Sequence, residues 1–265
     1  MEYLECFRQL MAGEVTPWVP NYELGLWGQT RQRWFQEGLP KDQVYCGDMF
    51  EGEPFFRLDR RAFARVDCGP IPRFEYRVIE ETDRYIIARH ENGVITKALK
   101  EGTVGGTRSC MDNYLEFPVK DRNSWQEMKK RFNPLTPIRY PLWWDQQVKM
   151  WQNRDYPLCL LGNGSFGLYS HLRRWAGTEK ISYLFYDDAA LVEEMVEFAS
   201  EFLLSLVEKA LQEVRFDYFN FFEDCAGKGG PLFGPEIFRR FFLKPYRRII
   251  DRLKRAGIFS FWVDS

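Results

Sequence analysis

Histidine is scarce in this chain, which has only His90 and His171 among its 265 residues. Two histidines cannot supply a histidine-rich metal site, so the sequence excludes that class of metalloprotein. Cysteine is better represented, but the six cysteines lie far apart and form no Cys-x-x-Cys pair. This spacing offers neither a zinc motif nor a disulfide framework, and it is typical of reduced thiols in the cytoplasm.

The sequence also lacks an excess of charge of one sign. It has 37 Lys and Arg residues against 38 Asp and Glu residues, and no basic run. We therefore expect neither nucleic acid nor an anionic membrane as a partner. No apolar stretch approaches the roughly 20 residues that span a bilayer, and Met1–Met11 lacks the basic region and apolar run of a signal peptide. We expect a cytoplasmic protein with a small-molecule substrate and consider a homodimer as its assembly.

What the sequence does contain is an alternation of apolar runs and amphipathic segments. The strand candidates are Trp18–Leu24, Leu158–Leu161, Val214–Phe222 and Ile258–Val263. Helices are expected at Met1–Met11, Gln29–Gln36, from a capping box at Ser124, Pro141–Asn153, Leu168–Trp175, Glu179–Tyr186, after Asp187-Asp188, and from Gly234-Pro235 to Gly257 with a kink at Pro245. This alternation predicts a parallel sheet with right-handed crossovers, in which ligands bind at the carboxyl ends of the strands.

A different pattern interrupts this alternation near the amino-terminal side. Phe74–Glu80, Arg84–His90 and Val94–Leu99 have the character of three antiparallel strands. Asn92-Gly93 between the last two strands is a strong hairpin turn, because both residues tolerate positive φ. We therefore expect residues 70–100 to form an antiparallel meander that is inserted into the main domain.

Four parallel strands are half of what a (β/α)₈ barrel requires. The last apolar run ends at Asp264-Ser265, whereas a parallel strand is normally followed by a covering helix. We expect residues 1–265 to form one α/β domain, a TIM-type (β/α)₈ barrel truncated before its last strand–helix units. A smaller open sheet is the alternative.

Acidic side chains stand where strand ends are expected. They are Glu23, Glu223, Asp224 and Asp264, and Asp48 lies in a loop before the insertion. A cleft ringed by carboxylates can shift their pKa values and perform acid–base chemistry, although each residue could instead cap a helix or face solvent.

His171 is the one histidine placed in a predicted first helical turn. It is a candidate general acid or base, with a purely structural role as the alternative. Trp143, Trp144 and Trp151 cluster on one predicted helix, where packing and a sugar-binding platform are both open.

The carboxyl half of the chain resembles the uroporphyrinogen decarboxylase superfamily. The segments that carry the resemblance are Phe221–Gly227, Pro231–Phe241, Pro245-Tyr246, Gly162–Gly167, Leu184–Asp188 and Leu115–Asp121, the last being similar to the divergent decarboxylase-like branch. They occur in the order found in that superfamily, and the resemblance extends over nearly the whole chain.

The resemblance implies a (β/α)₈ barrel with a cleft at the strand carboxyl ends and decarboxylation without a cofactor or metal. In such enzymes an essential aspartate follows an early strand and precedes a Gly-Pro segment, and Asp48 before Gly69-Pro70 has a similar placement. That carboxylate would hold pyrrole nitrogens and stabilise the cation formed when the ring is protonated. With the residues at strand ends, this assigns Asp48, Asp224 and His171 to catalysis and Glu23, Glu223 and Asp264 to substrate binding.

The sequence departs from the superfamily pattern in two places. Glu23–Trp27 stands where the decarboxylases carry arginines that bind substrate carboxylates, which leaves the substrate open. A corrinoid or thiol methyltransferase of the same superfamily is an alternative and would use zinc, but Asp264 occupies the place of its histidine ligand. The sequence also leaves open a glycoside hydrolase on an aromatic-rich barrel and a non-catalytic, truncated paralogue.

Overall fold

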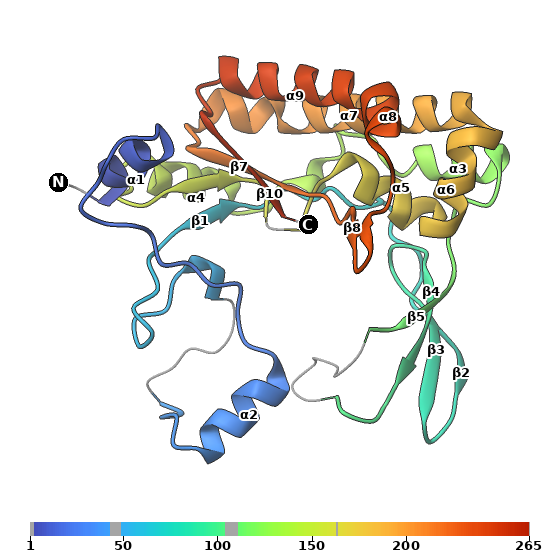
Figure 1. Ribbon diagram of the computed structural model, residues 1–265, viewed down its shortest axis with the longest axis horizontal. Coiled ribbons are helices and arrows are strands. Elements are labelled where there is room, and N and C mark those ends of the chain that lie inside the picture. The colour runs from blue at the N-terminus through green and yellow to red at the C-terminus, as the bar shows by residue number, and fades with distance from the viewer. Residues whose placement is uncertain (1–2, 43–48, 104–110, 163, 265) are drawn as a thin grey trace.

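The computed structural model describes residues 3–42, 49–103, 111–162 and 164–264, and two sheets form its framework (Figure 1). The first sheet is parallel and contains β1 (Ala62–Ala64), β6 (Leu158–Leu160), β7 (Tyr218–Phe222) and β10 (Ser260–Asp264), side by side in chain order. The second is antiparallel and contains β2 (Arg77–Glu81), β3 (Tyr85–Arg89), β4 (Ile95–Leu99) and β5 (Asn113–Glu116). The expected α/β class and the antiparallel meander are thus both confirmed, and the meander has a fourth strand.

Helices connect and cover the parallel strands. They are α1 (Tyr3–Met11), α2 (Gly28–Gln36), α3 (Arg122–Lys129), α4 (Trp144–Trp151), α5 (Leu168–Ala176), α6 (Thr178–Asp187), α7 (Ala189–Glu213), α8 (Pro235–Ile237) and α9 (Leu243–Arg255). Short elements are η1 (Met49–Glu51), η2 (Pro137–Arg139), the π-helical turn η3 (Phe238–Phe242) and the hairpin of β8 (Ala226–Gly227) and β9 (Gly230–Pro231). In the part of the chain that the structure describes, no helix combines the length and the apolar character that crossing a membrane requires.

The two faces of the parallel sheet carry different layers, because successive strand residues point to opposite sides. One face presents Leu158, Leu160, Phe219 and Phe221 to the main core, which includes the apolar sides of α5, α7 and α9. Figure 1 shows α7 and α9 lying together along this face. The opposite face presents Cys159, Tyr218 and other side chains to a smaller cluster.

Helix α1 closes this second face near the amino-terminal ends of the strands. Phe7 is fully buried and its ring lies 5.9 Å from that of Tyr218. Asp217, just before β7, accepts hydrogen bonds from Arg8 at 2.9 Å and from Arg154 at 2.8 Å, and it is 1% exposed. Through Arg8, this buried carboxylate ties α1 to the start of β7, while Arg154 offsets the same charge from the other side.

The expected first strand was wrong. Residues Trp18–Leu24 form no strand, and Pro20 in their middle lacks the N–H that a ladder needs. The first parallel strand is instead the three-residue β1, which pairs with β6.

Two helix boundaries also differ from expectation. The capping residue of α3 is Asp121, whose side chain accepts the Ser124 N–H at 2.7 Å, so Ser124 is the third residue of the helix and not its cap. The helix expected from Gly234 to Gly257 consists of α8, η3 and α9 in unbroken succession, and Pro245 is the third residue of α9. The irregularity comes just before it, as the π-helical turn η3.

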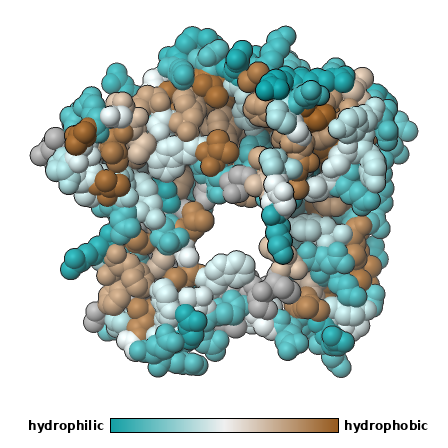
Figure 2. Space-filling model, in the orientation of Figure 1, coloured by the Kyte–Doolittle hydropathy of each residue, from teal (hydrophilic) through white to brown (hydrophobic). Residues whose placement is uncertain are grey.

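The antiparallel meander and the segment that carries α2 both extend away from the sheet (Figure 1). Figure 2 shows a wide opening between them, beneath the sheet. The meander reaches the rest of the protein through its hairpin tip and through β5, so it brings the Asn92-Gly93 turn close to α5.

Candidate functional site

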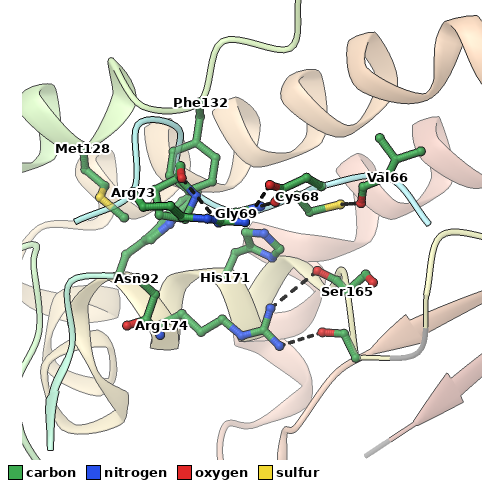
Figure 3. Close-up of a pocket in the computed structure, with 14 residues that line it drawn as sticks. Val66, Cys68, Gly69, Arg73, Asn92, Met128, Phe132, Ser165, His171 and Arg174 are labelled. Atoms are coloured by element: carbon green, nitrogen blue, oxygen red, sulfur yellow. Dashed lines mark hydrogen bonds and ion pairs between the residues drawn. The ribbon is translucent and has the colours of Figure 1, made fainter. Parts of the chain in front are cut away.

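Two neighbouring cavities, each of about 330 Å³, lie beyond the carboxyl ends of β1, β6 and β7. The first, which we call the His171 cavity, is bounded by the loops after β1 and β6, by α3 and by α5 (Figure 3). The second, the Phe117 cavity, is bounded by β5, α5 and the end of β7. Asn92 and Arg174 line both cavities. This is the end of a parallel sheet at which ligands are expected.

Helix α5 supplies both cavities with side chains, and a very close contact positions it. A Cβ atom on Gly167 would lie 1.9 Å from the Phe222 carbonyl oxygen at the end of β7. Only glycine permits this approach. Glu223 follows at once, and its two carboxylate oxygens accept the N–H groups of Tyr169 and Ser170 at 3.2 and 3.0 Å. A carboxylate at a helix amino terminus satisfies free N–H groups and matches the helix dipole.

Glu223 is 6% exposed, and burial raises its pKa to about 7 despite the hydrogen bonds from the first turn of α5. It was expected to bind substrate. The structure places it beneath the start of α5, where it lines neither of the two cavities and acts as the anchor of the helix.

His171 lines the cavity that carries its name and is 3% exposed. Its Nδ1 atom donates to the Gly167 carbonyl oxygen at 2.9 Å, and its ring packs 4.7 Å from that of Phe166. Desolvation by burial, helped by the positive charge of Arg174, lowers the His171 pKa to about 3. The imidazole is therefore neutral at physiological pH and is held in one orientation.

Arg174 is the cation that the two cavities share. Its Nη2 atom donates to the Gly164 carbonyl at 2.8 Å and its Nη1 atom to the Ser165 carbonyl at 3.5 Å (Figure 3). Burial lowers the pKa of this guanidinium, and among the described residues it forms no ion pair with a carboxylate. A guanidinium has five N–H donors, so Arg174 retains donors for an anion.

A carboxylate that the sequence reasoning missed lies in the loop after β1. Asp67 accepts the Gly69 N–H at 2.8 Å and the Arg73 guanidinium at 2.6 Å, and all three residues line the His171 cavity. Arg73 lies directly over Gly69, where a Cβ atom would come within 2.1 Å of its Nη1 atom. The signal is present in the sequence as an aspartate directly before Cys68-Gly69-Pro70, but the short β1 that precedes it has no strong strand pattern of its own.

Two further charged residues that line a cavity pair with each other. Asp224 forms an ion pair with Arg173, which also donates to the Thr178 hydroxyl at 2.9 Å. Both Asp224 and Arg173 line the Phe117 cavity. Asp224 thus lines this cavity, and its charge is offset by that of Arg173.

The other residues predicted for the site lie elsewhere. Asp48 falls outside the described residues. Glu23 is exposed, follows no strand and accepts the N–H of Leu24 at 2.6 Å. Asp264 is at the carboxyl end of β10, and its carbonyl oxygen accepts the Glu223 N–H at 2.8 Å. Neither Glu23 nor Asp264 lines the two cavities.

Within the described ranges, no group of three or more His, Cys, Asp or Glu side chains is arranged to hold a metal ion. Comparison with protein-family models, curated proteins and solved structures finds no match to this chain.

The contact at Gly167 predicts a steric cost for any side chain there. Gly167→Ala should lower the free energy of unfolding by roughly 1–3 kcal/mol, because its Cβ atom would overlap backbone at the end of β7. Gly234→Ala is the matched control, since Gly234 also precedes a helix and a Cβ atom there would meet nothing within 4 Å. Urea denaturation of both variants measures the difference, and equal losses would contradict the contact.

The burial of His171 predicts a pH dependence of stability. The unfolded chain binds a proton at His171 below about pH 6.5, whereas the folded protein does so only near pH 3, so the folded state loses stability as pH falls through this window. His171→Gln removes this loss. The stability gap between wild type and variant should therefore shrink by roughly 2 kcal/mol between pH 7 and pH 5. A gap that stays constant in urea titrations at the two pH values would contradict this placement.

Proposed function

We propose that this protein is a decarboxylase-like enzyme that acts on a small carboxylate substrate in the His171 cavity, without a metal or an organic cofactor. The observation that supports the proposal most is the position of Asp67. It follows the first parallel strand, precedes Gly69-Pro70 and lines a cavity at the strand carboxyl ends. The essential aspartate of the uroporphyrinogen decarboxylases, which the sequence resembles, also follows an early strand and precedes a Gly-Pro segment.

In this proposal Arg174 binds the substrate carboxylate and Asp67 faces its ring. Guanidinium groups bind carboxylates through paired N–H donors, and Arg174 has donors that its two carbonyl contacts do not use. The carboxylate of Asp67 can accept further hydrogen bonds beyond those from Gly69 and Arg73. It would thereby stabilise a cation on a nitrogen-containing ring.

The chemical step then needs only proton transfers. Protonation of a ring carbon creates a cation, and the bond between the substrate side chain and its carboxylate breaks. The electron pair of that bond neutralises the ring, and carbon dioxide leaves. A proton from water then completes the side chain, and loss of the proton first added to the ring carbon restores the aromatic ring. A carboxylate that stabilises the intermediate cation lowers the barrier, because it acts where charge develops.

The remaining candidate residues take supporting roles in this proposal. Neutral His171 forms part of the cavity wall and does not carry a proton into the reaction. Asp224 holds Arg173, and Glu223 holds the start of α5. Asp48 stays a candidate that the described residues leave untested.

The test of this proposal is the Asp67→Asn variant. Release of carbon dioxide should be measured with uroporphyrinogen and with a panel of pyrrole and indole acetates, and the variant should lose at least about 100-fold in kcat. Asp251→Asn on the exposed side of α9 is the matched control and should keep full activity.

Because Asp67 also pairs with Arg73, a structural effect must be separated from a chemical one. Arg73→Met breaks the same ion pair but leaves the carboxylate in place. If Asp67 acts on the substrate, Arg73→Met should retain much more activity than Asp67→Asn. Equal losses in the two variants, or full activity of Asp67→Asn, would overturn the role of Asp67.

We further propose that the parallel sheet is part of a (β/α)₈ barrel. Its strands lie in chain order, β1-β6-β7-β10, as in a singly wound barrel, whereas the strand order of a doubly wound sheet reverses. An apolar groove of about 500 Å³ lies between β10 and the segment from α8 to α9, lined by Phe221, Phe238, Phe242, Tyr246, Phe261 and Val263. A further strand on β10 and its following helix would cover this groove.

Hydrogen exchange on the native protein tests the barrel. If another strand pairs with β10, all amides of Ser260–Asp264 should be protected, including those that point away from β7. An unpaired edge would leave those outward amides exchanging as fast as amides in exposed loops, which would contradict a closed barrel.

A further inference from the structure

We propose that the natural ligand is a monocarboxylate whose carboxylate lies between the two neighbouring cavities. Besides the ring that faces Asp67, it places one planar aromatic group in the Phe117 cavity, and it is not a polycarboxylate. This rests on the proposed function, because it assigns the substrate class of the same site. Three observations carry it: the balance of charges that line the cavities, the hydrogen-bond donors of the two residues that line both cavities, and an aromatic pair in the second cavity.

Among the described residues that line the two cavities, the charges sum to one unpaired cation. Arg73 is offset by Asp67, with 2.6 Å between the guanidinium and the carboxylate. Arg173 is offset by Asp224. His171 is neutral. Only Arg174 has no carboxylate partner among the residues that the structure describes. One guanidinium offsets one carboxylate, and each further carboxylate of a ligand would lose its hydration without a matching cation.

The position of that carboxylate follows from the residues at the junction. Arg174 and Asn92 are the two residues that line both cavities. The Asn92 side-chain oxygen accepts the Val94 N–H at 3.0 Å, which directs the Nδ2 group away from the turn. Within the described ranges this group has no hydrogen-bond partner. A carboxylate between the two residues would receive donors from both (Figure 3).

The Phe117 cavity offers an aromatic surface next to this junction. The rings of Tyr114 and Phe117 are 5.9 Å apart and nearly parallel, at 14°, and Tyr114 is 52% exposed. Gly177 fixes the Phe117 ring, since a Cβ atom there would lie 2.5 Å from the ring edge. Stacked or edge-on contact with such rings favours a planar aromatic group. The cavity volume of about 330 Å³ is at the small end for ligand sites, which suits one ring.

Calorimetric titration at pH 7 tests the proposal with four small probes. Phenylacetate supplies one carboxylate and one ring, benzyl alcohol lacks the charge, acetate lacks the ring, and benzene-1,3,5-tricarboxylate adds two charges. Phenylacetate should bind at least about 10-fold more tightly than benzyl alcohol or acetate. Tighter binding of the tricarboxylate than of phenylacetate would overturn the proposal.

Variants assign the two halves of the ligand to their residues. Arg174→Met should weaken phenylacetate at least about 10-fold and leave benzyl alcohol nearly unchanged, whereas Phe117→Leu should weaken both aromatic probes and leave acetate unchanged. Arg174→Lys keeps the charge and should retain part of the affinity, which covers the case in which Arg174→Met does not fold. Arg240→Met is the control, since Arg240 pairs with Glu193 on the surface and lines neither cavity. Unchanged phenylacetate binding in Arg174→Met and Arg174→Lys would overturn the assignment.

Binding is measured here without turnover, so it separates this inference from the proposed function. Selective phenylacetate binding without carbon dioxide release from any tested acid would count against the decarboxylase and support the ligand class. Release of carbon dioxide only from a polycarboxylate would support the decarboxylase and count against the ligand class.

Discussion

The candidate site depends on the contact between the start of α5 and the end of β7. The Gly167 backbone lies against the Phe222 carbonyl so closely that no side chain fits between them. Glu223 then accepts two N–H groups of the first turn, and this fixes the rotation of the helix as well as its distance. Rotation matters because successive residues of a helix point about 100° apart. His171 and Arg174 reach the cavity because α5 is held in this one orientation.

That orientation also decides which arginine is available to a ligand. Arg173 and Arg174 are adjacent in sequence, yet Arg173 pairs with Asp224. Among the described residues, Arg174 contacts the carbonyls of Gly164 and Ser165 and the Phe222 ring, and it forms no ion pair with a carboxylate. Neutral carbonyls do not offset a half-buried guanidinium as a carboxylate does. A bound anion would complete the coordination of Arg174. The same helix thus contributes one cation to the framework and one to the cavity.

Much of the fold could be predicted from the sequence, because several segments carry strong local signals. The meander has alternating residues and an Asn-Gly turn, and α7 has Asp188 as its cap and a long apolar face. By contrast, β1 has only the residues Ala62–Ala64, next to Arg61 and Arg65, and its identity as a strand comes from pairing with β6. The longer apolar run at Trp18–Leu24 took its place in the prediction, although Pro20 disfavours a paired strand.

That one misplaced strand accounts for most of what the sequence could not reveal about the site. The superfamily pattern requires an aspartate after an early strand and before Gly69-Pro70, and with the first strand placed too early Asp48 meets that requirement. Once β1 is known, Asp67 has the same relation to strand and Gly-Pro segment, and it lines the cavity. The ion pair between Arg173 and Asp224 could not be predicted from the sequence either, because the two residues are 51 positions apart.

The pairing of these arginines also bears on the segment Glu23–Trp27. This segment contains no arginine, whereas the decarboxylases that the sequence resembles carry arginines in the corresponding region. From the sequence alone, the lack of arginine in this segment put binding of a substrate with several carboxylates in question. In the structure the number of arginines near the site matters less than their partners, because Arg73 and Arg173 are each offset by an aspartate. A site with a single unpaired cation suits one carboxylate. The absence of arginine at Glu23–Trp27 and the pairing of Arg73 and Arg173 are therefore consistent with the same, less highly charged ligand.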